Sequence, residues 1–382
     1  MSKIDDLIKE LCPDGAEFLD LVDCASIKRG KRVTKSDLDQ SAPFPVYSGG
    51  IKPMGYYHTY NQSKNTITVV KYGTAGFVNF IKEDFWANDV CYCVIPKKSL
   101  INKYLYYVLK NQEDYIKSQA TDAIPAHLPT DVICSIKIPV PPLEVQKEIV
   151  RVLDSFTELE AELEAELEAR KKQYEYYRNT LLTFNERESK TDDLIKKLCP
   201  DGVRFVCLDE VANLRRGSAI TKKNIIPGDV PVVAGGQKPA YFHSESNRGA
   251  NAVVVAGSGA YAGFVSFWSV PIFVSDAFSI EPLGGEVISK YIFYILKNRQ
   301  AELHNLKRGS GVPHVYSRDV ARWKIPVPPL EKQKQIVSIL DKFDALVNDI
   351  STGLPAEIEA RRKQYEYYRN KLLTFKELEC SK

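Results

Sequence analysis

An internal repeat constrains the fold of this chain more than any other feature of its sequence. Residues 138–144 recur without change at 325–331, and residues 170–184 recur at 361–375 with two substitutions. Self-similarity over such a long period indicates two copies of one structural unit. The proline pair in each opening phrase predicts an extended segment followed directly by a helix, because proline is tolerated in the first helical turn but not deeper.

The repeat also covers the segments that precede these phrases. Residues 5–15 return as 192–202 with one change, and residues 103–111 are similar to 290–298. Each half of the 382-residue chain is therefore a globular body followed by a long helical segment. We place the first body at 1–142, the first long helix at 143–189, the second body at 190–329 and the second long helix at 330–382.

Each long helix carries its apolar residues in a seam with the alternating spacing of a heptad repeat. A 3.5-residue period sustained over this length indicates a coiled coil. The first helix would be roughly 60 Å long, too long for a small core to cover, so its expected partner is the second helix. The seam residues are Ile149, Leu153, Phe156, Leu163, Leu167, Tyr174, Tyr177, Leu181, Ile336, Leu340, Phe343, Tyr365, Tyr368 and Leu372.

The second helix is longer than the first by four residues between its opening and closing phrases. An insertion of this size is a stutter, which locally unwinds a coiled coil. Gly353 and Pro355 lie at this place. We therefore predict a kink or a short break there, with Ile350 and Leu354 continuing the seam on either side.

The globular bodies combine short strands with a few helices. Their many Gly, Pro, Asn and Tyr residues indicate turns between strands. The predicted fold class is α+β, with the long helices forming a separate bundle. The sequence predicts an opening helix at 3–12, strands at 66–71, 90–95, 252–256 and 264–268, and later helices at 103–119 and 290–306.

Composition excludes several classes of protein. No apolar run reaches the roughly 18 residues of a membrane span, and acidic residues stand near the N-terminus where a signal peptide needs an apolar core. A cytoplasmic protein is therefore expected. The eight cysteines include no C-x-x-C pair, so we expect reduced, mostly buried thiols and no metal site.

Catalytic motifs are missing from the sequence. There is no phosphate-binding G-x-x-x-x-G-K-[ST] loop, no H-E-x-x-H, no G-x-S-x-G and no amino-methyltransferase Asn-Pro-Pro-Tyr motif. Gly257, Ser258 and Gly259 follow an apolar strand, as a dinucleotide-binding loop would. The residues after them resemble a second strand rather than a helix, which favours a hairpin loop. A catalytic role for this chain alone has little support.

Basic residues and tyrosines gather in the loops of both bodies. Such side chains hold phosphates and donate hydrogen bonds to guanine, although an isolated cluster is more often a solvated face. The bodies share a scaffold but differ in these loops, as two domains for different sites would, or as drift after duplication would produce. The candidate DNA-binding residues are Lys28, Arg29, Lys31, Arg32, Lys52, Lys71, Tyr72, Arg215, Arg216, Lys222, Lys223, Lys238, Ser258, Tyr261, Lys307 and Arg308.

Taken together, the chain resembles the specificity (S) subunit of a type I restriction–modification enzyme. The resemblance covers essentially the full length. It rests on the order of body and long helix, repeated twice, and on the phrase I-P-x-P-P-L-E-x-Q-x-x-I at 138–149 and 325–336.

This resemblance implies a non-catalytic, DNA-recognising subunit. Each body would be a target recognition domain for one half of a bipartite site in double-stranded DNA. The two helices would pack antiparallel, relate the bodies by a pseudo-two-fold axis and set their spacing. Two modification subunits would bring S-adenosylmethionine, and restriction subunits would bring ATP and Mg²⁺. The chain itself would hold no cofactor and contact no membrane.

Two other classes of function remain open from the residues alone. A duplicated protein-interaction adaptor on a coiled-coil strut would have the same helices without binding DNA. An enzyme with an unrecognised site would show turnover by the isolated chain. Charge reversal in the basic loops separates the first of these from a DNA-recognition subunit, because an adaptor would show no DNA phenotype.

Overall fold

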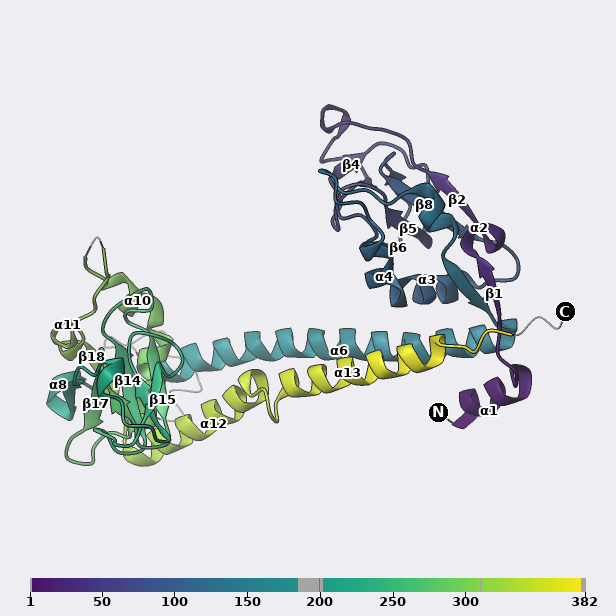
Figure 1. Cartoon of the computed structure of the whole chain (residues 1–382). Coiled ribbons are helices and arrows are strands. Elements are labelled where there is room, and N and C mark those ends of the chain that lie inside the picture. Colours follow the sequence, from purple (N-terminus) through teal and green to yellow (C-terminus); the bar gives the residue numbers. More distant parts are fainter. Residues whose placement is uncertain (1, 185–198, 200–201, 310, 379–382) are drawn as a thin grey trace. The chain divides into compact units, whose positions relative to one another are not determined.

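The computed structural model describes residues 2–184, 199, 202–309 and 311–378 (Figure 1). The chain divides into two compact units. Unit 1 comprises Met1–Leu163 with Ile358–Lys382, and unit 2 comprises Glu164–Glu357. Each unit thus contains one globular body and parts of the long helices from both repeats.

The body of unit 1 is built on a four-stranded antiparallel sheet of order β2-β8-β5-β6. A smaller sheet, β4-β3-β7, is formed by strands that come between those of the first sheet in the sequence. Strand β1 pairs with β9 just before the long helix begins. The strands are β1 (Glu17–Asp20), β2 (Ala25–Arg29), β3 (Phe44–Tyr47), β4 (Gly55–Tyr57), β5 (Thr66–Val70), β6 (Val78–Ile81), β7 (Trp86–Ala87), β8 (Cys91–Pro96) and β9 (Lys137–Val140). The helices are α1 (Ser2–Leu11), α2 (Leu21–Cys24), η1 (Lys35–Asp37), α3 (Asn102–Asn111), α4 (Glu113–Ser118) and α5 (Thr130–Cys134).

The body of unit 2 has the same topology, with sheets β11-β17-β14-β15, β13-β12-β16 and β10-β18. Its strands are β10 (Arg204–Cys207), β11 (Ala212–Arg216), β12 (Val230–Val233), β13 (Tyr241–His243), β14 (Ala252–Ala256), β15 (Val265–Trp268), β16 (Phe273–Val274), β17 (Ala277–Pro282) and β18 (Lys324–Val327). Its helices are α8 (Leu208–Val211), η2 (Lys222–Asn224), α9 (Ser289–Asn298), α10 (Gln300–Asn305) and α11 (Ser317–Ala321). The predicted α+β class and the four predicted strands are confirmed.

The core of each body lies between the four-stranded sheet and one helix. Strands β5 and β14 are buried over their full length, as expected for runs of apolar and β-branched residues. Helix α3 packs on this sheet in unit 1 (Figure 1), and α9 does so in unit 2. Tyr104 and its counterpart Tyr291 are fully buried there, and their hydroxyls donate to the carbonyls of Pro139 and Pro326.

The helices predicted at 103–119 and 290–306 exist, but each is divided into two. The breaks fall at Gln112 and Arg299, between α3 and α4 and between α9 and α10. Each break brings the next side chain to the sheet. Glu113 accepts a hydrogen bond from the backbone N–H of Val78, and Gln300 accepts one from Val265. Periodicity alone does not reveal such a requirement.

The first long helix is continuous, as predicted, over α6 (Leu143–Leu182). The second is divided into α12 (Leu330–Asn348) and α13 (Leu354–Leu373), which confirms the predicted break. The expectation that Ile350 continues the seam is wrong, because the break leaves this side chain 86% exposed. Asp349, the residue before Ile350, accepts hydrogen bonds from Ser351 and Thr352 in this turn. These bonds lower the pKa of Asp349 to about 2.

Within unit 1, the beginning of α6 packs antiparallel against the end of α13. Phe156 stacks on Tyr368 with ring centroids 5.5 Å apart and also contacts Tyr365. One turn further along α6, Glu160 forms an ion pair with Arg362 at 2.7 Å. Position numbers rise along one helix as they fall along the other, which is the antiparallel order.

Unit 2 contains the equivalent contacts with the repeats exchanged. Phe343 of α12, the counterpart of Phe156, stacks on Tyr177 at 5.3 Å and on Tyr174 at 6.2 Å. Most seam residues lie in or against the cores of the two units, whereas Leu163 is only half-buried.

The seven cysteines within the described residues are unpaired thiols. Cys91 and Cys93 are buried on β8, and burial raises the pKa of each to about 12. Cys380 and residues 192–198, which repeat the sequence of the opening segment, lie outside the described residues. No helix in the described part of the chain is both long and apolar enough to cross a membrane.

Candidate nucleic-acid interface

One edge of each four-stranded sheet collects the loops that carry the basic residues. In unit 1, β2 and β5 run in the same direction on either side of β8, so the segments that follow them meet at this edge. In unit 2, β11 and β14 are arranged in the same way around β17. The segment before α5 or α11 joins them, through backbone bridges between Tyr72 and His127 and between Ser258 and His314. We call these the loop edges of the two bodies.

In the first body, the end of β2 and the loop after it expose Lys28, Arg29, Lys31 and Arg32. Hydrogen bonds with the neighbouring segment 86–89 hold this loop in place. Trp86 Nε1 donates to the carbonyl of Lys31 at 2.7 Å. Asn88 donates to the carbonyl of Val33 at 3.0 Å and accepts from the N–H of Val33 at 3.2 Å. Arg29 Nη2 donates to the carbonyl of Asp89 at 3.2 Å. The basic side chains therefore extend from an ordered backbone.

Lys71 and Tyr72, after β5, form an aromatic cluster at the same loop edge. Tyr72 stacks on His127 at 5.5 Å, and the Lys71 ammonium lies 5.3 Å from the Tyr72 ring and 5.4 Å from that of Tyr92. The loop of Lys52 adjoins this cluster, because Thr74 donates to the carbonyl of Gly49. Lys52 itself is exposed.

In the second body, Arg215 and Arg216 end β11 and are both exposed. Arg215 is engaged by Glu281 at 3.5 Å. Beneath them lies Arg248, which sequence reasoning missed. Its guanidinium is almost wholly buried and donates to the carbonyls of Arg215 and Arg216 and to Ser279. Burial lowers the pKa of Arg248, and Glu281 compensates its charge at 3.1 Å.

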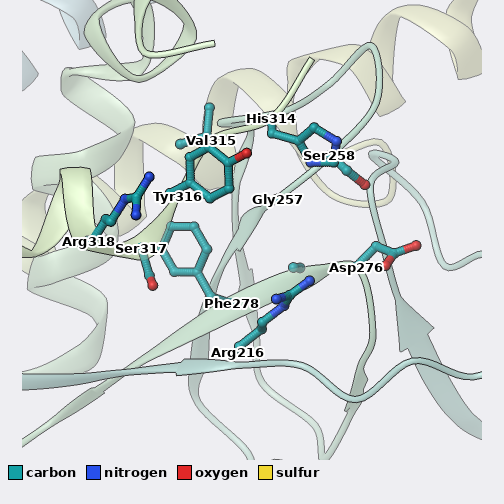
Figure 2. A pocket seen from close by; sticks show the side chains of 11 residues that line it. Arg216, Gly257, Ser258, Asp276, Phe278, His314, Val315, Tyr316, Ser317 and Arg318 are labelled. Carbon is teal, nitrogen blue, oxygen red and sulfur yellow. The ribbon is translucent and has the colours of Figure 1, made fainter. Parts of the chain in front are cut away.

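A pocket of about 220 Å³ opens at the loop edge of the second body (Figure 2). Its wall is formed on one side by His314, which stacks on Tyr316 at 6.1 Å, and by Arg318, whose guanidinium lies 5.0 Å from the Tyr316 ring. Residues from four segments line it, namely Arg216, Gly257, Ser258, Asp276, Ala277, Phe278, His314, Val315, Tyr316, Ser317 and Arg318. Thus Arg216 and Ser258, distant in sequence, face one cavity.

The loop after α10 closes onto the same edge. Lys307 donates to the carbonyl of Ala260 at 2.9 Å, and Arg308 forms an ion pair with Asp319 at 3.4 Å. Arg308 also bridges to the backbone of His314. Lys307 and Arg308 therefore each have a partner within their own domain.

The remaining candidates of the second body occupy neighbouring loops. Tyr261 is exposed in the turn between β14 and β15, an antiparallel hairpin that confirms the predicted loop at 257–259. Lys238 is exposed in a turn that contacts the loop of Ser258. The two loops approach closely at Gly235, because a Cβ there would lie 2.3 Å from the carbonyl oxygen of Ser258. Lys222 and Lys223 belong to η2, further along the segment after β11.

Sequence reasoning missed Arg248, Asn88 and Asp276. The first two are buried polar residues that fix the loop edges, and they stand in polar segments where nothing in the pattern signals burial. Asp276 lines the pocket, but clusters of basic residues in the sequence do not point to an acidic one. Within the described residues no group of three His, Cys, Asp or Glu side chains is arranged to hold a metal ion.

Comparison with known proteins places this architecture in a family. The model of the type I restriction modification DNA specificity domain matches residues 13–169 and again residues 200–360. The chain belongs to this family. It is a type I specificity subunit with two tandem recognition domains, and an adaptor unrelated to restriction–modification is not favoured.

Relatives of similar length support the assignment. A Haemophilus influenzae protein provisionally assigned as a type I restriction enzyme specificity subunit is 31% identical over 377 residues, covering 91% of this chain and 92% of the relative. The Escherichia coli EcoR124I/EcoR124II specificity subunit is 32% identical over 306 residues, covering 72% of this chain and 70% of the relative.

Solved structures share the fold. The type I restriction–modification S subunit of Mycoplasma genitalium superposes with a TM-score of 0.69 at 20% identity, covering 94% of this chain and 96% of that one. The HsdS subunit of Thermoanaerobacter tengcongensis gives a TM-score of 0.51 at 16% identity, covering 95% and 97%.

Proposed function

We propose that this chain selects the DNA site of a type I restriction–modification complex, with each recognition domain recognising one half of a bipartite target. In this proposal the loop edges are the DNA-facing surfaces. The long helices set the distance between the half-sites and provide the surface on which modification subunits dock.

The observation that carries the proposal is a pair of reciprocal contacts. In unit 2, Arg178 from the closing phrase of the first repeat donates to Asn298 of the second body at 3.0 Å. In unit 1, Arg369 from the closing phrase of the second repeat donates to Asn111 of the first body, also at 3.0 Å. Equivalent residues thus make the same contact with their roles exchanged, which is the signature of two-fold pairing. Half-sites on opposite strands of DNA have this symmetry as well.

The loop edges differ between the two bodies, which supports unlike half-sites. The first presents Lys71, Tyr72 and four basic residues around β2, whereas the second presents a pocket with Arg216 and Ser258. Basic side chains at both edges would contact phosphates, so affinity should fall steeply as salt rises.

The chemistry of the complex would belong to partner subunits. Two modification subunits would carry S-adenosylmethionine, and restriction subunits would carry ATP and Mg²⁺ for translocation and cleavage. This chain would act in the cytoplasm without a cofactor or an active site of its own, by positioning the partners on double-stranded DNA.

The test is to delete the gene in its native host and map modified bases across the genome. We expect one bipartite pattern of methylated sites to disappear and to return on complementation. Purification of the tagged chain should recover modification subunits at two copies per chain. If no methylated pattern depends on the gene and no methyltransferase copurifies, the proposal is wrong.

A further inference from the structure

The pocket at the loop edge of the second body contains two charged groups without partners. Arg216 and Asp276 both line it, and both are exposed. Neither the guanidinium nor the carboxylate has a hydrogen bond or ion pair in the part of the chain that the structure describes. The neighbouring Arg215 and Arg308, by contrast, are engaged by Glu281 and Asp319.

Both groups stand on fixed backbone. The carbonyl of Arg216 accepts a hydrogen bond from buried Arg248 at 2.8 Å, and that of Asp276 accepts one from the N–H of Gly257 at 3.0 Å. Figure 2 shows the guanidinium end of Arg216 directed toward the side of the pocket where Asp276 lies. A donor fork and an acceptor pair therefore line one pocket without forming an ion pair with each other.

This combination is unsuited to a phosphate, because the Asp276 carboxylate would repel it. It does match the major-groove edge of one base pair. Guanine presents the acceptors O6 and N7, which suit a bidentate arginine, and the paired cytosine presents its N4 amino group, which suits a carboxylate. We propose that Arg216 and Asp276 together recognise a G·C pair in the half-site of the second recognition domain. This proposal rests on the function proposed above and names one element of its target.

The equivalent place in the first body is built differently, although it also has an arginine. There Arg29 donates to the backbone carbonyl of Asp89 at 3.2 Å instead of extending freely. Tyr72, stacked on His127, stands where the second body has Ser258. The first body also has a carboxylate at this place, that of Asp89, but its arginine is engaged by the backbone. A free arginine beside a carboxylate thus belongs to the second domain, so the G·C preference should appear in one half-site only.

The experiment is a selection from a random duplex library at one fixed salt concentration, with the full chain purified together with its modification subunits. The variants are Arg216→Gln and Asp276→Ala. Arg322→Gln is the charge-matched control, because this exposed arginine follows α11 and does not line the pocket. A second measurement replaces the selected guanine by 7-deazaguanine, which lacks the N7 acceptor.

We expect Arg216→Gln to reduce the preference for guanine at one position of one half-site by about 5- to 150-fold. Asp276→Ala should relax the same base pair, and Arg322→Gln should leave the selected motif unchanged. The 7-deazaguanine duplex should bind the wild-type complex more weakly but bind the Arg216→Gln complex no worse than the natural duplex.

Three results would overturn the inference while the proposed function stood: a wild-type motif without guanine in that half-site, an unchanged motif in both variants, or equally weakened binding to all sequences. If the wild-type complex selected no motif at all, the proposed function itself would fail.

Discussion

A single buried glutamine ties each long helix to its body. Gln333 is fully buried. Its Oε1 accepts from the N–H of Ile288 at 3.0 Å, and its Nε2 donates to the carbonyls of Glu286 and Pro328 at 2.9 and 2.8 Å. Gln146 makes the equivalent three bonds in unit 1. The glutamine of the repeated phrase is therefore a structural residue that satisfies backbone groups at the start of the helix.

Replacing it should destabilise the unit that contains it. Gln333→Ala leaves buried backbone groups unsatisfied, so the free energy of unfolding should fall by about 1–3 kcal/mol. The measurement is urea unfolding followed by tryptophan fluorescence, to which Trp268 and Trp323 of unit 2 contribute. Gln335→Ala, the same change at an exposed position of the same helix, should have little effect. Equal losses in the two variants would contradict this role.

Acid stability should depend on Glu113, whose counterpart in unit 2 is the neutral Gln300. Burial raises the pKa of Glu113, but hydrogen bonds from Lys110, Lys117 and Val78 outweigh burial and hold it below the usual value. A carboxyl whose pKa is lowered on folding adds stability above its unfolded pKa of about 4.3, and this stability is lost as pH falls through the folded value.

We therefore expect Glu113→Gln to be less stable than wild type at pH 7 and the difference to shrink as pH falls below about 4.3. The measurement is the urea midpoint against pH, followed by tryptophan fluorescence, to which Trp86 of unit 1 contributes. Gln300→Glu provides the reverse change in unit 2. A stability difference for Glu113→Gln that stays constant from neutral to acidic pH would show that the ionised carboxylate is not the cause.

At the scale of elements, the break between α12 and α13 depends on a glycine. A Cβ at Gly353 would lie 2.4 Å from the carbonyl oxygen of Ala345, 2.8 Å from that of Leu346 and 2.7 Å from that of Asp349. These are backbone atoms at the end of α12, and they cannot move aside cheaply. The chain therefore returns closely over the helix end only because position 353 has no side chain.

Gly353→Ala should accordingly lower the free energy of unfolding of unit 2 by about 1–3 kcal/mol, the usual range for overpacking. Gly249→Ala is the matched control, since a Cβ there meets nothing within 4 Å. Circular dichroism and urea unfolding of both variants provide the comparison. A Gly353→Ala variant as stable as wild type would mean that the turn rearranges without cost.

At the scale of the whole molecule, each unit is completed by the closing phrase of the other repeat. Arg178 meets Asn298 in unit 2, and Arg369 meets Asn111 in unit 1. A chain shortened to residues 1–189 keeps one body and one closing phrase. It lacks Arg369, the partner of Asn111, and Asn298, the partner of Arg178. Two copies could supply these partners to each other. Phe156 of one copy would stack on Tyr177 of the other, as Phe343 does in the full chain.

We expect this half-chain to form a homodimer, and Arg178→Glu to weaken it. Light scattering after size-exclusion chromatography gives the mass directly. A half-chain that stays monomeric and folded at micromolar concentration would show that the reciprocal contacts do not drive association.

The sequence reveals the architecture well because its main signals are local or repeated. The duplicated phrases, the heptad seam and the insertion beside Gly353 predict the two bodies, the long helix and its break. The loop edges were harder to predict. Buried Arg248 and Asn88 lie in polar segments, and their role depends on strands that are adjacent only after folding. The pairing of Arg216 with Asp276 in one pocket likewise depends on the sheet register rather than on spacing in the sequence.

The most direct test of the account replaces the second body with a copy of the first. The chimera carries residues 1–142 in place of 190–329 and keeps both helices. It is expressed in a host lacking the native gene, and methylated bases are mapped across the genome. If each recognition domain recognises its own half-site, the new target should consist of two identical half-sites in inverted order. A target that retains the original second half-site would contradict the account.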